Sequence, residues 1–110
     1  MERYEVTITP DAAADLTELR DYIAGALFSP DAARSCIRSI RLEIEKLELL
    51  PAIHPLVEEE PWHSRGVRSM LVKNFLIYYR VDEPANHVDI LNVIYARRDQ
   101  WRILRNRENR

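Results

Sequence analysis

The sequence has few of the residues that build disulfides, metal sites and flexible linkers. It contains one cysteine, two glycines and three histidines in 110 residues. A single thiol cannot close an internal disulfide, and the scattered histidines lack the spacing of zinc ligands. We therefore expect no disulfide framework, no metal site and no cofactor.

Long uncharged hydrophobic runs are also missing. No stretch approaches the roughly 18 apolar residues of a membrane span, and the start Met1-Glu2-Arg3-Tyr4-Glu5 does not resemble a secretory leader. The sequence therefore predicts a cytoplasmic protein without membrane contact. Hydrophobic residues at 46% and charged residues at 31% are typical of a folded chain, and the length predicts one domain over residues 1–110.

The net charge of -2 hides an uneven distribution along the chain. Residues 1–61 hold six Lys/Arg against thirteen Asp/Glu, a balance of -7, and residues 62–110 hold ten against five, a balance of +5. We expect an anionic partner to meet the C-terminal half. The alternative is that these arginines are solvated faces of strands and helices.

The N-terminal half predicts one strand and two helices. Alternation over residues 4–9 favours a short strand. Both helices start alike, at Thr9-Pro10-Asp11 and Ser29-Pro30-Asp31, with a hydroxyl as cap and proline at the first helical position. Gly25 is expected to end the first helix, and Pro51 to stop the second. Apolar residues at helical spacing predict the core face of this hairpin: Ala12, Leu16, Leu19, Ile23, Ala33, Ile37, Ile40, Ile44 and Leu47.

The second half predicts a surface connection over residues 51–62, followed by three strands. Residues 67–73 and 75–81 form a hairpin through Lys73-Asn74, where asparagine suits positive φ. A third strand covers residues 87–95, and residues 99–106 form a short terminal helix or tail. The order predicts an α+β fold with an N-terminal strand, an antiparallel helical hairpin packed on one face of a mainly antiparallel sheet, and a short C-terminal helix.

Three blocks of sequence carry a resemblance to a known family. They are Val6-Thr7-Ile8-Thr9-Pro10-Asp11-Ala12 followed by Asp15-Leu16, the stretch GVRSMLVKNFLIYYRVD at 66–82, and VIYARRD at 93–99. Together they resemble the RelE/ParE superfamily of toxins from type II toxin-antitoxin systems, over nearly the whole chain. The resemblance implies a small cytoplasmic growth-inhibiting toxin that a cognate antitoxin protein neutralises.

The resemblance leaves two targets open. RelE-like members are ribosome-dependent endoribonucleases that cleave mRNA, whereas ParE-like members, the branch of plasmid-stabilisation toxins, inhibit DNA gyrase without nuclease chemistry. The nuclease branch has an arginine just after the hairpin turn and a tyrosine near the C-terminus, and the matching positions here are Leu76 and a site near Leu104. We therefore favour DNA gyrase as the target. The alternatives are the ribosome with its mRNA, or a non-toxic relative that only binds a partner.

Candidate catalytic residues are few. Metal-free RNA cleavage needs a base, a proton donor and cations facing the charge that develops on phosphorus. Arg68 and Arg98 match basic positions implied by the resemblance, His63 carries an imidazole suited to proton transfer, and Tyr95 carries a phenol. The structural alternatives are an exposed loop histidine and a packed strand aromatic.

Arginines near two strand ends form the predicted binding surface. We expect Arg65, Arg68, Arg97 and Arg98 to face the target, since a meander could bring the two ends together. The antitoxin is expected to cover the exposed faces of residues 11–50 and the adjacent sheet edge.

Overall fold

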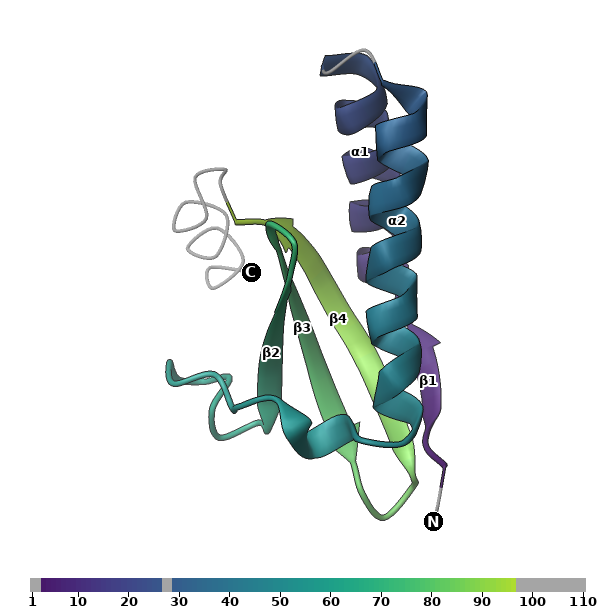
Figure 1. Cartoon of the computed structure of the whole chain (residues 1–110). Coiled ribbons are helices and arrows are strands. Elements are labelled where there is room, and N and C mark those ends of the chain that lie inside the picture. Colours follow the sequence, from purple (N-terminus) through teal and green to yellow (C-terminus); the bar gives the residue numbers. More distant parts are fainter. Residues whose placement is uncertain (1–2, 27–28, 97–110) are drawn as a thin grey trace.

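The computed structural model describes residues 3–26 and 29–96 (Figure 1). Its elements confirm the predicted α+β order: β1 (Glu5–Ile8), α1 (Pro10–Ala26), α2 (Pro30–Glu45), the 3-10 helices η1 (Lys46–Glu48) and η2 (Pro51–Ile53), β2 (Val67–Val72), β3 (Phe75–Asp82) and β4 (His87–Tyr95). The predicted C-terminal helix, Arg97 and Arg98 lie outside the described residues.

The four strands form one sheet in the order β1-β4-β3-β2. β1 runs parallel to β4, and the other neighbours are antiparallel, which confirms the mainly antiparallel sheet. A parallel pair needs a long crossover, and the helical hairpin and the two strands after it supply one. The two helices lie side by side over one face of the sheet (Figure 1).

Capping hydrogen bonds confirm both predicted helix starts. The Thr9 hydroxyl accepts from the Ala12 backbone N–H at 3.3 Å, and the Ser29 hydroxyl accepts from that of Ala32 at 3.2 Å. The prediction that Gly25 ends the first helix is wrong, since α1 continues to Ala26 and Gly25 does not adopt positive φ. Glycine inside a helix costs about 1 kcal/mol relative to alanine, which packing of the apolar face outweighs.

The core lies between the hairpin and the sheet. Eight of the nine predicted helical positions are at most 6% exposed, and Ile37 is the half-buried exception. Their partners on the sheet include Met70, Ile77, Tyr79 and Val88. Each large apolar side chain buried in this way contributes about 1.5–3 kcal/mol.

The predicted hairpin turn is confirmed, but its details differ. Val72 lies opposite Phe75, and Lys73 rather than Asn74 takes the positive φ, at 56°. The prediction for Asn74 is therefore wrong. Its carbonyl accepts from the Ala96 backbone N–H at 2.7 Å, so this residue connects the turn to the end of β4.

The predicted surface connection over residues 51–62 is wrong in one respect, because part of it pairs with β2. The Val57 backbone N–H donates to the Val67 carbonyl at 2.8 Å, and that of Ser69 donates to the Pro55 carbonyl at 3.2 Å. Leu56 thereby pairs with Arg68, and the 51–66 segment covers the first part of the β2 edge. Covered edges protect a sheet from pairing with other chains.

Helix α1 is fastened to an irregularity in the sheet. The pairing of β3 with β4 shifts between Tyr78 and Tyr79, as at a β-bulge. The buried carboxylate of Asp15 accepts from the Val93 backbone N–H at 2.9 Å and from the Asn92 amide at 3.3 Å. A side chain of α1 thus satisfies a backbone donor beside the bulge.

Candidate functional site

His63 and Arg65 lie on an exposed turn that leads into β2. The turn is closed by backbone bonds, including one of 3.0 Å from the Gly66 N–H to the His63 carbonyl, and Gly66 has a φ of 75°. His63 Nδ1 lies 2.9 Å from the Val57 carbonyl. Because a carbonyl can only accept, this nitrogen carries the proton, and the imidazole helps to hold the turn.

Arg68 lies on β2 beside a buried tyrosine. Its Nη1 donates to the His54 carbonyl at 2.8 Å. Tyr79, opposite Arg68 on β3, is fully buried and donates its hydroxyl to the Pro51 carbonyl at 2.7 Å. Burial raises the pKa of Tyr79 above 10.0, while the nearby Arg68 charge acts in the opposite direction. Both side chains thus hold the 51–66 segment against the sheet.

Tyr95, one of the catalytic candidates, lies at the other end of the sheet from Arg68. Tyr95 lies opposite Phe75, whereas Arg68 lies opposite Tyr79. The stretch of β3 between those partners spans about 13 Å. The ring of Tyr95 packs edge-on against Phe75, with centroids 5.1 Å apart, and against Tyr22 at 6.2 Å. Tyr95 is therefore placed as a packing aromatic rather than beside His63.

The sheet face away from the helices is apolar near the hairpin turn. Side chains alternate between the two faces along a strand. Because Met70 and Ile77 point into the core, their neighbours Leu71 and Leu76 point to the other face of the sheet. Leu71 pairs with Leu76 and is 64% exposed, and Leu76 pairs in turn with Ile94. Leu76 is the position at which the family resemblance implies an arginine in the nuclease branch. Apolar side chains therefore occupy this part of the sheet.

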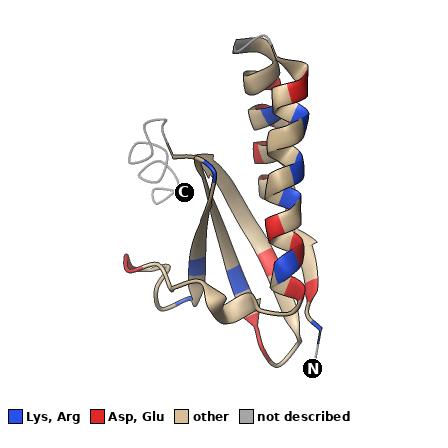
Figure 2. Ribbon diagram, in the orientation of Figure 1, with Lys and Arg blue, Asp and Glu red and all other residues tan. Residues whose placement is uncertain are grey.

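Sequence reasoning missed a second group of arginines, on the helical hairpin. Arg34, Arg38 and Arg41 follow one another at helical spacing on α2, where Figure 2 shows basic residues in a row. Arg20 joins them from α1. The spacing was visible in the sequence, but the -7 balance of residues 1–61 concealed that one face is basic.

A groove runs between these arginines. The depression consists of two hollows of about 350 and 380 Å³, which share Arg20, Ile37 and Arg41 as lining residues. The two hollows are lined by residues of β1, α1 and α2: Ile8, Ala13, Leu16, Thr17, Arg20, Arg34, Ile37, Arg38, Arg41, Leu42 and Glu45. We call this depression the hairpin groove. It combines an apolar floor with basic rims.

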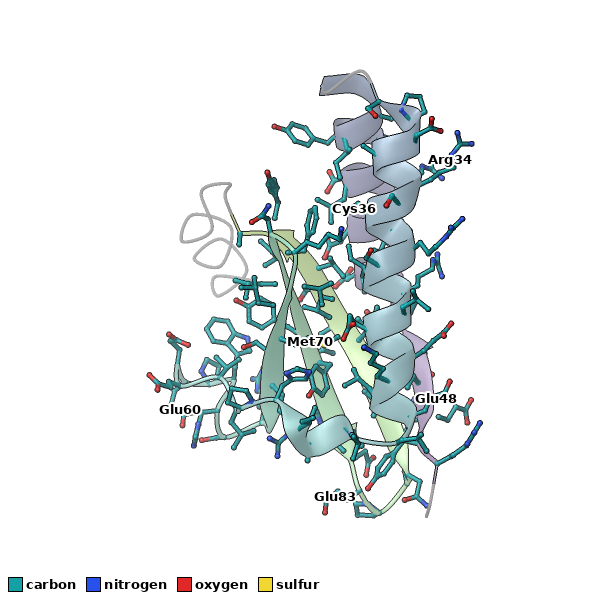
Figure 3. The ribbon with its side chains drawn as sticks, in the orientation of Figure 1. Arg34, Cys36, Glu48, Glu60, Met70 and Glu83 are labelled. Carbon is teal, nitrogen blue, oxygen red and sulfur yellow. The ribbon has the colours of Figure 1, made fainter. Side chains whose placement is uncertain are left out.

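The arginines of the groove differ in their partners. Arg34 pairs with Asp31 at 2.6 Å, and Arg20 pairs with its neighbour Asp21 at 3.3 Å. Arg38 and Arg41 are exposed and make no ion pair with any described residue. Figure 3 shows the Arg34 side chain pointing away from the sheet. The groove therefore presents two exposed guanidinium groups without an ion pair among the described residues, and the carboxylate of Glu45 lines the same hollow.

Within residues 3–26 and 29–96, no three His, Cys, Asp or Glu side chains are grouped to hold a metal ion. In the same ranges no helix has the length and apolar character needed to cross a bilayer.

Known proteins resemble this chain both in sequence pattern and in fold. Residues 6–100 fit the family model described as the ParE toxin of the type II toxin-antitoxin system, parDE. No curated protein sequence matches the chain. Among solved structures, the chromosomal ParDE toxin-antitoxin system from P. aeruginosa aligns with a TM-score of 0.69 and 23% identity, covering 84% of this chain and 96% of that chain.

Two further structures share the fold. The RelBE2 toxin-antitoxin complex from Mycobacterium tuberculosis aligns with a TM-score of 0.61 and 22% identity, over 86% of this chain and 93% of that chain. A mutant E. coli toxin RelE in the free state aligns with a TM-score of 0.61 and 12% identity, over 89% of this chain and 88% of that chain. At such identities the structural likeness establishes the fold, and the family model identifies the branch that the chain matches.

Proposed function

This chain belongs to the ParE toxin family of type II toxin-antitoxin systems, and we propose that it arrests bacterial growth by binding DNA gyrase. The match to the ParE family model over residues 6–100 is the observation that carries the proposal. A toxin that acts by binding needs a complementary surface and no proton-transfer pair.

The proposed target surface lies at the start of β2. The start of β2 and the end of β4 lie at opposite ends of the sheet, because both strands run antiparallel to β3, contrary to the expectation that the meander brings these two strand ends together. Arg65 is exposed in the turn before β2 and belongs to this surface. Arg68 acts mainly by fixing the 51–66 segment, because its guanidinium bonds to the His54 carbonyl. Arg97 and Arg98 follow β4 in the chain, lie outside the described residues and remain predicted target-binding residues from the sequence.

Three positions favour gyrase binding over the mRNA endonuclease alternative. Leu76 is apolar where the nuclease branch has an arginine, His63 Nδ1 is engaged by the Val57 carbonyl, and Tyr95 packs against Phe75. The imidazole and the phenol also belong to opposite ends of the β2–β3 hairpin. General acid-base catalysis needs both groups within hydrogen-bonding reach of one substrate.

We also propose that a cognate antitoxin neutralises the toxin. The P. aeruginosa and M. tuberculosis relatives are toxin-antitoxin systems or complexes by description. The exposed faces of residues 11–50 and the adjacent sheet edge are the proposed contact region. This region is distinct from the arginines proposed to face gyrase.

The test is a pair of assays on the purified toxin. DNA supercoiling by gyrase should be inhibited, and messages in a translating extract should stay intact. Replacing Arg65, Arg97 and Arg98 together with alanine should abolish inhibition and leave antitoxin binding in place. Arg3→Ala is the control, at an exposed arginine next to β1, on the sheet edge away from β2. Cleavage of translated messages with normal gyrase activity would contradict the proposal.

A further inference from the structure

We infer that the open part of the β2 edge pairs with the same edge of a second copy of this chain, so that the toxin without antitoxin forms a two-fold symmetric dimer. The inference goes beyond the proposed function and does not depend on the target. Its basis is the juxtaposition of outward-facing backbone groups, exposed leucines on two layers of the fold, and a cation beside an acid.

The edge strand β2 is covered only over its first part. The Val67 carbonyl and the Ser69 N–H point away from β3 and bond to the 51–66 segment. Backbone groups alternate in direction along an antiparallel strand, so the N–H and the carbonyl of Leu71 point outward as well. Neither group forms a hydrogen bond with a residue in the ranges 3–26 and 29–96. An open edge of this kind is a template for another strand.

Two exposed leucines flank the open edge, one on each layer of the fold. Leu71 is 64% exposed on the sheet face away from the helices, and Leu42 on α2 is 52% exposed. Both line a hollow of about 450 Å³ between α2 and the end of β2, whose other lining residues are Ser39, Glu43, Val72 and Lys73. Contiguous exposed apolar surface marks a site of association. Pairing at this edge removes both leucine side chains from water.

The charges beside the edge favour a second copy as the occupant. Lys73 makes no ion pair with any described residue, and Glu43 pairs with Lys46, one turn along the same helix, at 2.8 Å. A two-fold axis makes every contact twice, so Lys73 of each copy meets Glu43 of the other copy. The surface is thus complementary to itself. The arginines of the hairpin groove, in contrast, would repel a second copy placed there.

Antiparallel pairing at Leu71 gives one continuous sheet of eight strands, four from each copy. The two Leu71 residues exchange N–H···O bonds, and their side chains lie directly opposite each other on one face. The 51–66 segment occupies the edge beside Val67 and Ser69 and ends the pairing there. Because the paired stretch is short, we expect a weak dimer with a dissociation constant on the order of 10 µM.

The experiment measures the mass of the purified full-length toxin, freed of antitoxin, by sedimentation velocity from about 1 to about 200 µM. The mass should rise from 13.0 kDa toward twice that value. Leu71→Glu should weaken dimerisation at least about tenfold, because it places like charges directly opposite each other. The matched control is Ile53→Glu on η2, since Ile53 is also 64% exposed and lies outside the hollow. It should change the dissociation constant by less than about twofold.

A pair of charge reversals tests the contact between copies. Lys73→Glu and Glu43→Lys should each weaken self-association about fivefold, since each variant faces a like charge in its partner. A mixture of the two single variants restores opposite charges at both contacts. The mixture should therefore associate within about twofold of the wild-type affinity. A role of either side chain inside one copy cannot produce this rescue.

Hydrogen exchange of backbone amides detects the strand pairing itself. The Leu71 amide should exchange at least about tenfold more slowly at 200 µM than at 1 µM, because the partner strand protects it only in the dimer. The Ser69 amide is the internal control, since it already donates to the Pro55 carbonyl at 3.2 Å and should not respond to concentration. Thermal unfolding of each variant separates lost association from lost folding, and the mixed variants decide if Leu71→Glu does not fold.

Each outcome decides for or against the dimer. A toxin that stays monomeric over the whole concentration range overturns the inference, and so does a dimer that survives Leu71→Glu. Failure of the mixed single variants to associate also overturns it. Protection of the Leu71 amide that appears only after antitoxin is added assigns the edge to an antitoxin strand instead. None of these measurements involves gyrase, so failure of the proposed target leaves the result for the dimer unchanged.

Discussion

Arg68 on β2 and Arg41 on α2 carry the same side chain in opposite situations. Arg68 is half-buried, and its guanidinium donates to the His54 carbonyl at 2.8 Å. Arg41 is exposed at the rim of the hairpin groove, and no described residue forms an ion pair with it. The fold uses the first charge internally and leaves the second exposed, so the nearest hydrogen-bond acceptor decides whether an arginine has a structural role.

The regions around these two arginines are also held together differently. The hairpin depends on apolar packing, with Ala12 and Ile40 both fully buried between helices and sheet. The 51–66 segment depends on side chains that reach its backbone, namely Arg68 to His54 and Tyr79 to Pro51. The stabilisation from hydrophobic burial is spread over many residues. Each of these two hydrogen bonds, in contrast, holds one position of the segment, and its removal frees the segment at that position. Substitutions in the two regions should therefore differ in size and in pH dependence.

The largest loss of stability is expected in the hairpin. Ile40 on α2 is 0% exposed, so Ile40→Ala removes buried apolar surface and leaves a cavity. The free energy of unfolding should fall by about 2–5 kcal/mol, as measured by urea denaturation. A fall below about 1 kcal/mol would mean that the hairpin is not packed on the sheet as described.

A smaller loss is expected when the two arginines are compared directly. Arg68→Ala removes a charged hydrogen bond and frees the His54 carbonyl, so it should cost about 1.5–3 kcal/mol. Arg41→Ala should change stability by less than about 0.5 kcal/mol, because the side chain is exposed and unpaired in the described part. Equal effects on the urea midpoint would remove the distinction between a structural and an available arginine.

Local chemistry made the elements predictable. Thr9-Pro10-Asp11 and Ser29-Pro30-Asp31 each combine a capping hydroxyl with proline, and each begins a helix where expected. The alternation after residue 66 likewise located the strands of the meander. These signals act over a few residues, so a single sequence contains all of the information that they need.

Contacts between distant segments were not predictable. The bond from Arg68 to His54 depends on how the 51–66 segment returns along the β2 edge. The hairpin groove needs Arg20 of α1 beside Ile37 of α2, so the spacing on α2 alone could not reveal it. The sequence likewise could not show that the start of β2, next to Arg65, and the end of β4, which precedes Arg97 and Arg98, lie at opposite ends of the sheet. The sequence shows where the arginines are along the chain, and only the fold shows which of them lie on the same surface.

The last expected effect concerns Tyr79 and depends on pH. Tyr79→Phe removes the hydroxyl bond to the Pro51 carbonyl and should cost about 1 kcal/mol near pH 8. Burial raises the pKa of the folded-state phenol above 10.0, so unfolded chains lose this proton first as the pH rises. Wild-type stability is complete below pH 10 and then falls by up to about 1.4 kcal/mol per pH unit, a term that phenylalanine lacks. Urea midpoints measured from pH 8 to pH 11 should therefore converge for the two proteins. Parallel curves would show that this phenol titrates alike in both states, and that the 51–66 segment does not shield it from water.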